Sequence, residues 1–364
     1  MIRILRDQRG GSLMLTAVCG GVVLGMAALA IDVGMLYAAK AQAQNAADAG
    51  ALAGAGSLLL APDDDTVATV VAEEFAEKHE IMNQTTMIEP GADIQVDLGA
   101  MTVTVTARRT NERGNAVPTF FGKMLDYLPG GIDQSLVDVV ATATAQVTPA
   151  SAASCLKPWA IPDAYDDVND NGVFDAGDYY EPGVTSWGTN YRNNNYDFGQ
   201  QLTLKHGSPG DAISPGQFFP IDLPIPDGPD VGGDRYRENI AQCNGLIVEV
   251  GDLISTENGN MIGPTQQGVQ DLIDLDPDAV WDPTLGIVNS DYPPGASPRI
   301  GRVPMFDPRF PPDSGKQSLE VTNIAGFFIE QVAGNGRVTG RLVPTTGTGE
   351  PAPGTMINTV RLVR

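Results

Sequence analysis

The sequence contains few of the residues on which catalytic and metal centres usually depend. Its 364 residues include two histidines and three cysteines, which leaves little material for a zinc site. Basic residues are also scarce, because 22 Lys and Arg stand against 45 Asp and Glu, for a formal net charge of −23. Phosphate binding needs a cationic protein face, so this charge argues against nucleic acid as a partner of the chain.

The motifs of several enzyme classes are absent as well. The sequence has no G-x-x-x-x-G-K-[ST] loop for nucleotide phosphates, no G-x-S-x-G nucleophile turn and no H-E-x-x-H zinc motif. His79 lies in a polar stretch and His206 precedes Gly207-Ser208, and no cysteine or serine is suggestively placed near either. We therefore predict that the protein is not an enzyme and binds no nucleotide.

The sequence does contain enough apolar material for a core, together with many turn-forming residues. Hydrophobic residues make up 42% of the chain, so it is not disordered overall. The 42 glycines and 27 prolines exceed the usual share of these two residues. Such a composition is typical of a loop-rich or β-rich body.

The N-terminus carries one long uncharged run, from Gly10 to Ile31, behind Arg3, Arg6 and Arg9. About 20 apolar residues suffice to span a bilayer as a helix, and an arginine-rich flank stays in the cytoplasm. The alternative is a cleaved signal peptide ending at residues 28–30 (Ala-Leu-Ala), but the run exceeds the usual apolar region of ~7–15 residues. We therefore expect a retained single span, with a cytoplasmic tail over residues 1–11 and the rest of the chain outside.

Alanine dominates residues 32–60, so the span is predicted to continue outward and to form one transmembrane and stem helix over residues 12–60. Small residues recur along it and would let a neighbouring helix approach closely. They are Gly20, Gly21, Gly25, Gly34, Ala46, Ala47, Gly50, Ala53 and Gly54. One reading is a single anchor with a stem, and the other is a rod that packs beside similar helices. Asp32, at the outer edge of the span, is interpreted as pointing to water, and the alternative is that it pairs with a neighbour.

These residues also carry a family resemblance. Arg9-Gly10, the acid after the apolar run in AIDVG (residues 30–34) and the segment Q-x-A-A-D-A-x-A-L-A (residues 44–53) resemble the N-terminal module of TadE/TadG-like proteins of the Tad/Flp pilus. The resemblance implies a bacterial inner-membrane protein with a cytoplasmic N-terminus and a periplasmic body. Its implied role is to help build or anchor an adhesive pilus beside other Tad-like single-span membrane proteins, with no catalytic residues in the module.

One position departs from the pattern of the pilins themselves. Prepilins of this system have a Glu five residues after the glycine at which they are cleaved. If Gly11 corresponds to that glycine, the equivalent position in this sequence is Thr16. We therefore expect no prepilin processing here.

Residues 62–150 are predicted to form a small α+β unit. Helical spacing within a helix over residues 66–80, which Thr66 can cap, is shown by Val67, Val70, Val71, Phe75 and Ala76. Strands are predicted over residues 93–98, 101–107 and 136–147, with a short helix over residues 118–125.

Residues 151–364 are predicted to form a β-rich, loop-heavy domain. Short apolar segments between turn residues predict strands over residues 245–250, 300–305, 319–326, 327–332 and 337–343, and one short helix over residues 265–272. The fold class expected for the whole chain is α+β, with the long N-terminal transmembrane helix leading into the small α+β unit and this domain.

A twelve-residue segment in this domain, DVNDNGVFDAGD (residues 167–178), has the spacing of a calcium loop. Oxygen side chains stand at loop positions 1, 3, 5, 9 and 12, glycine at position 6, and a carbonyl is available at position 7. The ligands would be Asp167, Asn169, Asn171, Val173 (carbonyl), Asp175 and Asp178. The loop resembles those of EF-hand and dockerin modules but ends on Asp rather than Glu. A structural Ca²⁺ site is the prediction, and an empty Asx-rich turn is the alternative.

The three cysteines divide by location. Cys19 lies in the span and is interpreted as a small apolar residue. Cys155 and Cys243 both lie in the expected periplasmic body, where an oxidising compartment favours a disulfide between them.

The leading hypothesis is a non-enzymatic structural or accessory component of a Tad/Flp-type pilus assembly machine, anchored in the inner membrane. The alternative is an envelope-anchored or secreted glycan-binding or hydrolytic module supported by the calcium loop. Aromatic rings that could stack on sugars motivate it: Tyr179, Tyr180, Trp187, Tyr191, Tyr196 and Phe198.

Overall fold

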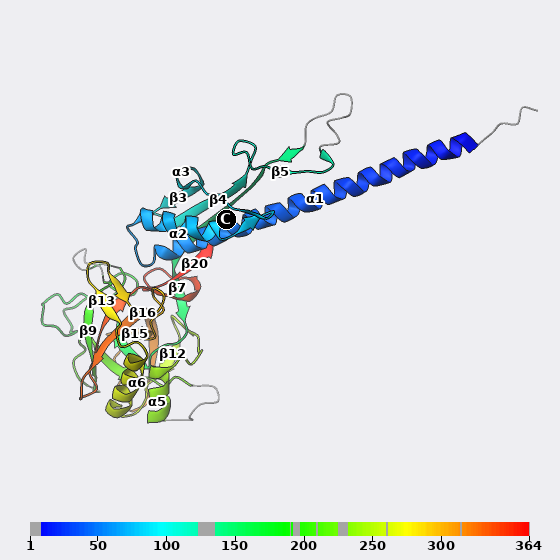
Figure 1. The fold of residues 1–364 in the computed structure, drawn as a ribbon. Helices are drawn as coiled ribbons and strands as arrows, with labels where there is room; N and C mark the ends of the chain where they lie inside the picture. Colours follow the sequence, from blue (N-terminus) through cyan, green and yellow to red (C-terminus); the bar gives the residue numbers. More distant parts are fainter. Residues whose placement is uncertain are drawn as a thin grey trace, which may run out of the picture. The chain divides into compact units, whose positions relative to one another are not determined.

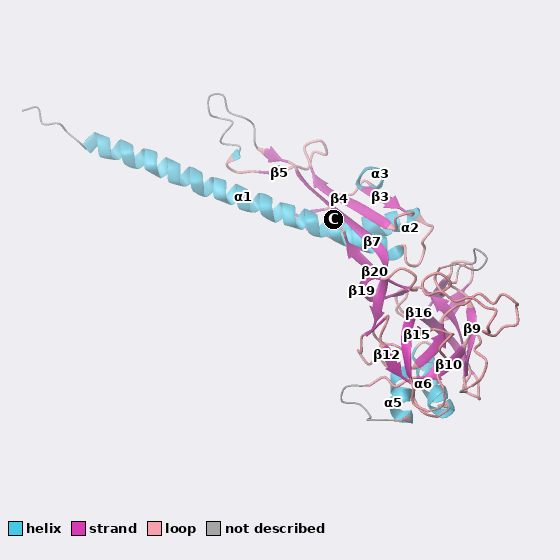
Figure 2. Ribbon diagram, turned by 180° about the vertical axis from the view of Figure 1, so that it is seen from behind, coloured by secondary structure: helices cyan, strands magenta, loops and turns pink. Residues whose placement is uncertain are grey.

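A computed structural model describes residues 9–122, 135–189, 191, 197–208, 210–224, 232–259, 261–313 and 315–363. The chain divides into two compact units. The first contains the N-terminal helix and continues over residues 64–146, with the last residues of the chain, and the second contains residues 58–63 and 147–361. Figures 1 and 2 trace their elements.

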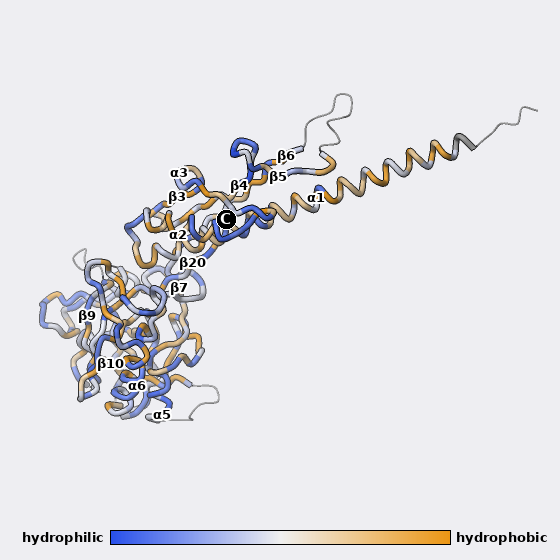
Figure 3. Tube along the Cα trace, viewed as in Figure 1, coloured by the Kyte–Doolittle hydropathy of each residue, from blue (hydrophilic) through white to orange (hydrophobic). Residues whose placement is uncertain are grey.

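The N-terminal helix α1 spans Arg9–Ser57 without a break, a length of about 73 Å at ~1.5 Å per residue. The predicted continuous transmembrane and stem helix is therefore present and ends three residues before Leu60. Its first part is uniformly apolar in Figure 3, and the side chains from Leu13 to Ile31 are almost all exposed. Its second part is buried from Ala39 onward along one face, within its own unit.

Helix α2 (Asp65–Glu77) packs against the C-terminal part of α1. Asp64, not Thr66, caps it by accepting the N–H groups of Thr66 and Val67 at 3.0 Å each. Of the predicted apolar stripe, Ala76 is buried as expected, but the rest is wrong, because the helix buries Ala68 and Ala72 beside it, while Val67, Val70 and Phe75 are exposed. The reason is the close approach of two helix backbones, which only small side chains allow.

Gly54 of α1 is one of two glycines at the closest points of this approach. A β-carbon there would lie 2.9 Å from Ala72 Cβ, 2.9 Å from Val103 Cγ1 and 3.0 Å from the Ala68 carbonyl oxygen. Gly50, one turn earlier, would meet the Ala72 carbonyl oxygen at 2.8 Å. The alanine and glycine residues of this part of α1 therefore pack inside their own unit.

Gly54→Ala is expected to destabilise the first unit by about 1–3 kcal/mol, because the added methyl group has no space. Gly56→Ala is the matched control, since a β-carbon at Gly56 has no atom within 4 Å. That change should be neutral or stabilise by up to ~1 kcal/mol through helix propensity. Hydrogen exchange of the amides in the sheet beneath α1, measured on the full protein in detergent, compares the two. Equal protection in both variants would contradict the packing described.

The sheet of the first unit is antiparallel, in the order β3 (Ile94–Asp97), β4 (Thr102–Arg109) and β7 (Val139–Ala153). β4 alternates as predicted, with Val103, Val105 and Ala107 buried and threonines on the other face. β7 contributes its residues up to Gln146 to this unit and the remainder to the second. The smaller elements are β1 (Glu80–Ile81), β2 (Gln84–Thr85), α3 (Pro90–Asp93), β5 (Val117–Pro118) and β6 (Leu136–Val137). Residues 123–125 of the predicted short helix lie outside the described part.

Asp93 is the charged centre of the first unit. Its side chain is fully buried and binds two guanidinium groups, Arg108 at 2.7 Å and Arg113 at 2.6 Å. It also accepts the N–H of Glu89 at 3.0 Å, and the hydrogen bond to Asp93 raises the pKa of Arg113. This buried cluster joins α3 to β4 and to the loop that follows β4.

The second unit is built on a closed ring of six strands. β16 (Ser318–Val332) pairs with both β15 (Ile300–Phe306) and β17 (Val338–Val343), and the ring is completed through β8, β10 and β9. The remaining bounds are β8 (Trp159–Pro162), β9 (Gln201–His206) and β10 (Gln217–Pro220). The β15–β8 and β10–β9 pairs are parallel and the other ring pairs antiparallel.

Alternate residues of these strands form the core of the ring. Trp159, Phe218, Phe327 and Leu342 belong to one buried cluster that also includes side chains of two helices. The helices are α5 (Gly233–Ala241) and α6 (Ile262–Leu275), the second of which contains the predicted helix 265–272. Two predicted strands, 319–326 and 327–332, are one continuous strand, β16, and the predicted strand 245–250 is reduced to β11 (Val248–Glu249).

The other strands of the second unit are short. They are β12 (Leu253–Ser255), β13 (Val280–Asp282), β14 (Ile287–Asn289), β18 (Thr345–Thr346), β19 (Thr348–Pro351) and β20 (Ile357–Leu362). β12 pairs with β16, and β13 pairs with β14. β11 and β19 both pair with the second half of β7. The chain therefore has a long apolar helix and a β-rich body that contains both helices and strands, as predicted.

Candidate functional site

The apolar part of α1 is the first candidate site. Among the described residues, α1 is the one helix long and apolar enough to cross a membrane, over residues 12–57. Its exposed apolar side chains include Leu24 at 72% and Leu15 at 66%. Gly20, Gly21 and Gly34 leave open space beside the helix, since a β-carbon at any of them has no atom within 4 Å. Water is a poor solvent for such a surface, whereas lipid or another apolar helix is a good one.

Asp32, at the outer end of this apolar part, does not point to water. Its side chain is buried and accepts three backbone N–H groups, from Phe120 at 2.8 Å, Phe121 at 2.7 Å and Gly122 at 3.1 Å. The interpretation as a water-facing acid is therefore wrong. The carboxylate instead holds a loop of the first unit against the helix, an interaction between residues nearly ninety positions apart that no local pattern indicates.

Polar residues further along α1 also bind within the first unit. The Lys40 ammonium donates to the Val140 carbonyl oxygen on β7. Gln44 donates to Asp48 at 2.7 Å and lies 3.5 Å from the Thr142 carbonyl oxygen. Ala46 and Ala47 have no exposed surface. The Q-x-A-A-D-A segment is thus used to dock α1 on its own sheet.

The loop 167–178 closes on itself through its own side chains. Asp167 accepts the N–H groups of Asn171 at 3.1 Å and Gly172 at 2.7 Å. Asp178 accepts the N–H groups of Val168 at 2.9 Å and Asp175 at 2.8 Å. The turn requires backbone in the left-handed region, with φ of 79° at Gly172 and 55° at Asp170.

Asp175 is the meeting point of the two asparagines. Its Oδ2 accepts the amide N–H groups of Asn169 at 3.0 Å and Asn171 at 2.7 Å. The N–H of Gly177 and then these two amides lower the pKa of the Asp175 carboxyl, so it is charged at neutral pH. The side-chain amides of Asn169 and Asn171 both point their nitrogen at Asp175. Rotating either amide group by a half-turn would place its oxygen at that position instead.

These positions fit a calcium ion only with help from neutral oxygens. Among the described residues, no three side chains of the His, Cys, Asp or Glu type lie close enough together to hold a metal. Asp167, Asp175 and Asp178 would therefore need the amide oxygens of Asn169 and Asn171, and the Val173 carbonyl, to complete the six to eight oxygens that calcium takes. The loop brings the predicted residues together, and calcium binding remains a prediction.

Cys155 and Cys243 are joined in a disulfide, with their Cα atoms 4.4 Å apart and a sequence separation of 88. Cys155 follows β7 and Cys243 follows α5, so the bond links the C-terminal end of β7 to the C-terminal end of α5. Cys19 is an exposed free thiol on the apolar part of α1. The predicted pairing is the one found.

The aromatic residues near the calcium loop are divided between core and surface. Tyr180 is buried, Trp187 and Phe198 are partly buried and pack on the ring core, Tyr179 and Tyr191 are exposed, and Tyr196 lies outside the described residues. The largest ring, Trp187, therefore serves packing rather than an open stacking surface.

A buried polar network joins this segment to the ring. Asp163 accepts the N–H of Trp187 at 3.0 Å and the hydroxyl of Tyr180 at 3.1 Å, while Asn323 of β16 donates to the Trp187 carbonyl oxygen at 3.0 Å. Burial raises the pKa of the Asp163 carboxyl, and the hydrogen bonds from its neighbours oppose that rise. The loop 167–178 is thus followed by a segment that is fixed in the core at Trp187.

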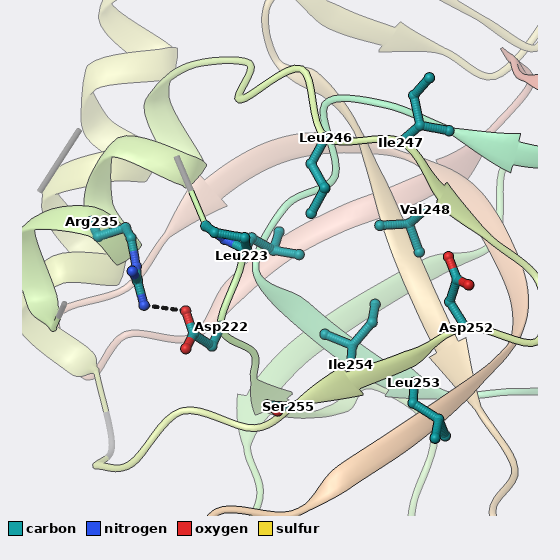
Figure 4. A pocket seen from close by; sticks show the side chains of 11 residues that line it. Asp222, Leu223, Arg235, Leu246, Ile247, Val248, Asp252, Leu253, Ile254 and Ser255 are labelled. Atoms are coloured by element: carbon teal, nitrogen blue, oxygen red, sulfur yellow. Dashed lines mark hydrogen bonds and ion pairs between the residues drawn. The ribbon is translucent and has the colours of Figure 1, made fainter. Parts of the chain in front are cut away.

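A shallow cleft of about 400 Å³ lies between α5 and β12 (Figure 4). Most of its lining side chains are apolar, including Leu223, Val248 and Ile254. Its polar groups are an ion pair between Asp222 and Arg235, together with Asp252 and Ser255. Lys316 also binds Asp222, at 2.8 Å. The lining contains neither histidine nor cysteine, and the one carboxylate beside Arg235 is already neutralised by two cations. His79 and His206 lie elsewhere, each against a backbone carbonyl oxygen.

Lys157 is a buried cation in the second unit. It donates to the Ile240 carbonyl oxygen, and its alkyl chain lies over Gly301. Burial, with repulsion from Arg302, lowers the pKa of its ammonium group to about 8.

This lysine should make the stability of the second unit depend on pH. Between pH ~8 and ~10.4 the unfolded chain binds more protons than the folded one, so stability rises with pH across that window. Lys157→Met is expected to remove this rise and to stabilise the unit by about 2–3 kcal/mol at pH 7. All three tryptophans belong to this unit, so their emission during denaturant unfolding measures it. Lys205→Met, an exposed lysine, is the control, and a rise of equal size in the Lys157→Met protein would refute the assignment.

The comparisons with known proteins bear on the first candidate site. No curated protein and no solved structure matches the chain. Residues 10–57 match the family described as putative Flp pilus-assembly TadE/G-like. The match runs from the second residue of α1 to its last, so it includes the apolar part, Asp32 and the alanine-rich part that docks on the sheet. The N-terminal helix of this protein is therefore similar to the putative Flp pilus-assembly TadE/G-like family over residues 10–57.

Proposed function

We propose that the protein is a non-enzymatic structural or accessory component of a Tad/Flp-type pilus assembly machine. In this proposal α1 anchors it in the bacterial inner membrane, with the N-terminus in the cytoplasm and both units in the periplasm. The match of residues 10–57 to the pilus-assembly family carries the proposal. The arginines before the span and the exposed apolar surface of α1 support the anchoring and its direction.

The contacts of α1 limit where partner helices could bind. One face of its alanine-rich part is covered by α2 and β4, so the surface we propose for lateral packing is the apolar part with its small residues Gly20 and Gly21, continuing to Gly34. The partners we propose are other Tad-like single-span membrane proteins, with the lipid bilayer around them.

Photocrosslinking in cells tests this role. A photoreactive residue at Val22, which is 51% exposed, should yield products with single-span proteins of the pilus machine. The same residue at Val18, 56% exposed and about one turn away, maps the face that packs. Deletion of the gene should reduce surface pili. Normal piliation together with the absence of crosslinks from both sites would contradict the proposal.

We also propose that the loop 167–178 binds a structural calcium ion. Millimolar calcium should raise the unfolding temperature of the second unit, followed by tryptophan emission, because extracellular loops of this kind bind at roughly 10⁻⁴–10⁻³ M. Replacing Asp167, Asp175 and Asp178 with alanine should abolish that shift. Replacing Asp271, Asp274 and Asp278 with alanine removes the same charge elsewhere and should leave it. No shift with calcium in the parent protein would rule the site out.

A further inference from the structure

The segment that Asp32 holds is apolar and lies beside the predicted membrane span. We name residues 118–122 (PTFFG) the FF segment. Phe120 is 70% exposed, and Leu136, which pairs with Pro118 across β5 and β6, is 48% exposed. Phe121 turns toward α1, where its ring lies 3.6 Å from the position that a β-carbon on Gly25 would occupy. An exposed phenylalanine and a helix-packed phenylalanine therefore stand next to each other.

The register of α1 gives the depth of this segment. Gly25 is fifteen residues after Gly10, or about 22 Å along the helix at ~1.5 Å per residue. The hydrocarbon core of a bilayer is about 30 Å thick. With the Arg9 end of the apolar run at the inner boundary, Gly25 lies inside the outer leaflet. The ring of Phe121, in contact with Gly25, lies at the same level.

The backbone of the FF segment lies beside Asp32, twenty-two residues after Gly10 or about 33 Å along the helix, which is the outer boundary of the hydrocarbon core. Backbone at this boundary needs internal hydrogen-bond partners, because hydrocarbon offers none. Asp32 supplies them, since its two carboxylate oxygens accept the N–H groups of Phe120, Phe121 and Gly122. The N–H of Thr119 is bound as well, to the Ser135 carbonyl oxygen at 2.9 Å. The FF segment thus presents apolar side chains outward while its backbone donors are satisfied.

We propose that the FF segment enters the outer leaflet of the membrane and forms a second lipid contact beside α1, with Asp32 as the acceptor that makes a non-helical backbone tolerable there. The occupant of this surface is phospholipid acyl chain, because Phe120 is 70% exposed next to Phe121, whose ring packs on α1 at Gly25 within the exposed apolar run. The inference rests on the proposed anchoring by α1. It gives the acid of the TadE/G-like module a physical role.

Tryptophan quenching in reconstituted vesicles tests the proposal. The first unit has no tryptophan, so Phe120→Trp adds a probe at the FF segment. Its emission is obtained by subtracting the tryptophan emission of the parent protein. The vesicles contain phospholipids brominated either near the glycerol or near the chain ends. Phe310→Trp is the matched control, since Phe310 is 71% exposed in the second unit, and Leu24→Trp reports on the span itself.

The added emission of Phe120→Trp should be blue-shifted and strongly quenched, most by bromine near the glycerol, while that of Phe310→Trp should not be quenched. Quenching of Leu24→Trp without quenching of Phe120→Trp would overturn the FF segment proposal alone. Absence of quenching at both sites would overturn the anchoring. Asp32→Ala in the Phe120→Trp protein should shift the emission to the red and remove its quenching, and unchanged quenching would overturn the role given to Asp32.

Discussion

Replacing Cys155 and Cys243 together with serine is expected to lower the free energy of unfolding of the second unit by about 4–5 kcal/mol. The bond closes a loop of 88 residues, and the chain-entropy model gives about this value for a loop of that length. The loss is large because a domain of ordinary stability has only about 5–15 kcal/mol in total. Since the three tryptophans belong to this unit, the midpoint of denaturant unfolding followed by their emission measures it directly.

The free cysteine provides the control for the disulfide. Cys19→Ser changes a thiol on the apolar part of α1 and should leave the tryptophan midpoint unchanged. Reductant should lower the midpoint of the parent and of the Cys19→Ser protein equally, and should not affect the double variant. Alkylation of Cys155 or Cys243 in unreduced protein isolated from cells would show that the bond does not form there.

Replacing Asp93 with alanine is expected to destabilise the first unit by about 3–5 kcal/mol. The substitution removes the carboxylate that Arg108 and Arg113 both bind, and although Arg113 keeps Glu89 at 3.1 Å, the charge of Arg108 is left uncompensated. Hydrogen exchange of β3 and β4 amides, measured by mass spectrometry on the full protein in detergent, should show the loss of protection.

An exposed ion pair in the same unit is the comparison for Asp93. Glu74 and Lys78 on α2 lie 2.8 Å apart with more than half of each side chain exposed. Glu74→Ala should therefore cost less than about 1 kcal/mol. If Asp93→Ala changed the exchange of β4 no more than Glu74→Ala, the Asp93 cluster would not support the fold as described.

The parts of the fold that the sequence predicts best are those where one pattern dominates. An uninterrupted alanine-rich and apolar run predicts α1, and strict alternation predicts β4. α2 shows the limit of such patterns, because hydrophobicity favours Val67, Val70 and Phe75 as its buried face, whereas the structure buries three alanines. The geometry of approach to Gly50 and Gly54 decided the face, and that geometry depends on residues in another helix.

The candidate sites divide in the same way. Compartment chemistry predicts the Cys155–Cys243 pair, which the structure confirms. Local spacing predicts the loop 167–178 as a calcium site, which stays a prediction. The partners of Asp32 were not predicted, since its three hydrogen bonds are to backbone N–H groups some ninety residues away and carry no side-chain signature. The ring of the second unit was also missed, because β8, β9 and β10 are short and their pairing is set by contacts distant in sequence.

The most direct test of the central claim is protease accessibility in intact cells and in spheroplasts, with tags at both ends of the protein. The account predicts a full-length, membrane-bound protein whose body is digested from the periplasmic side of spheroplasts, leaving a membrane-retained fragment that carries the N-terminal tag. A soluble and shortened protein, or a body protected in spheroplasts and digested only after lysis, would contradict a periplasmic protein anchored by its TadE/G-like helix.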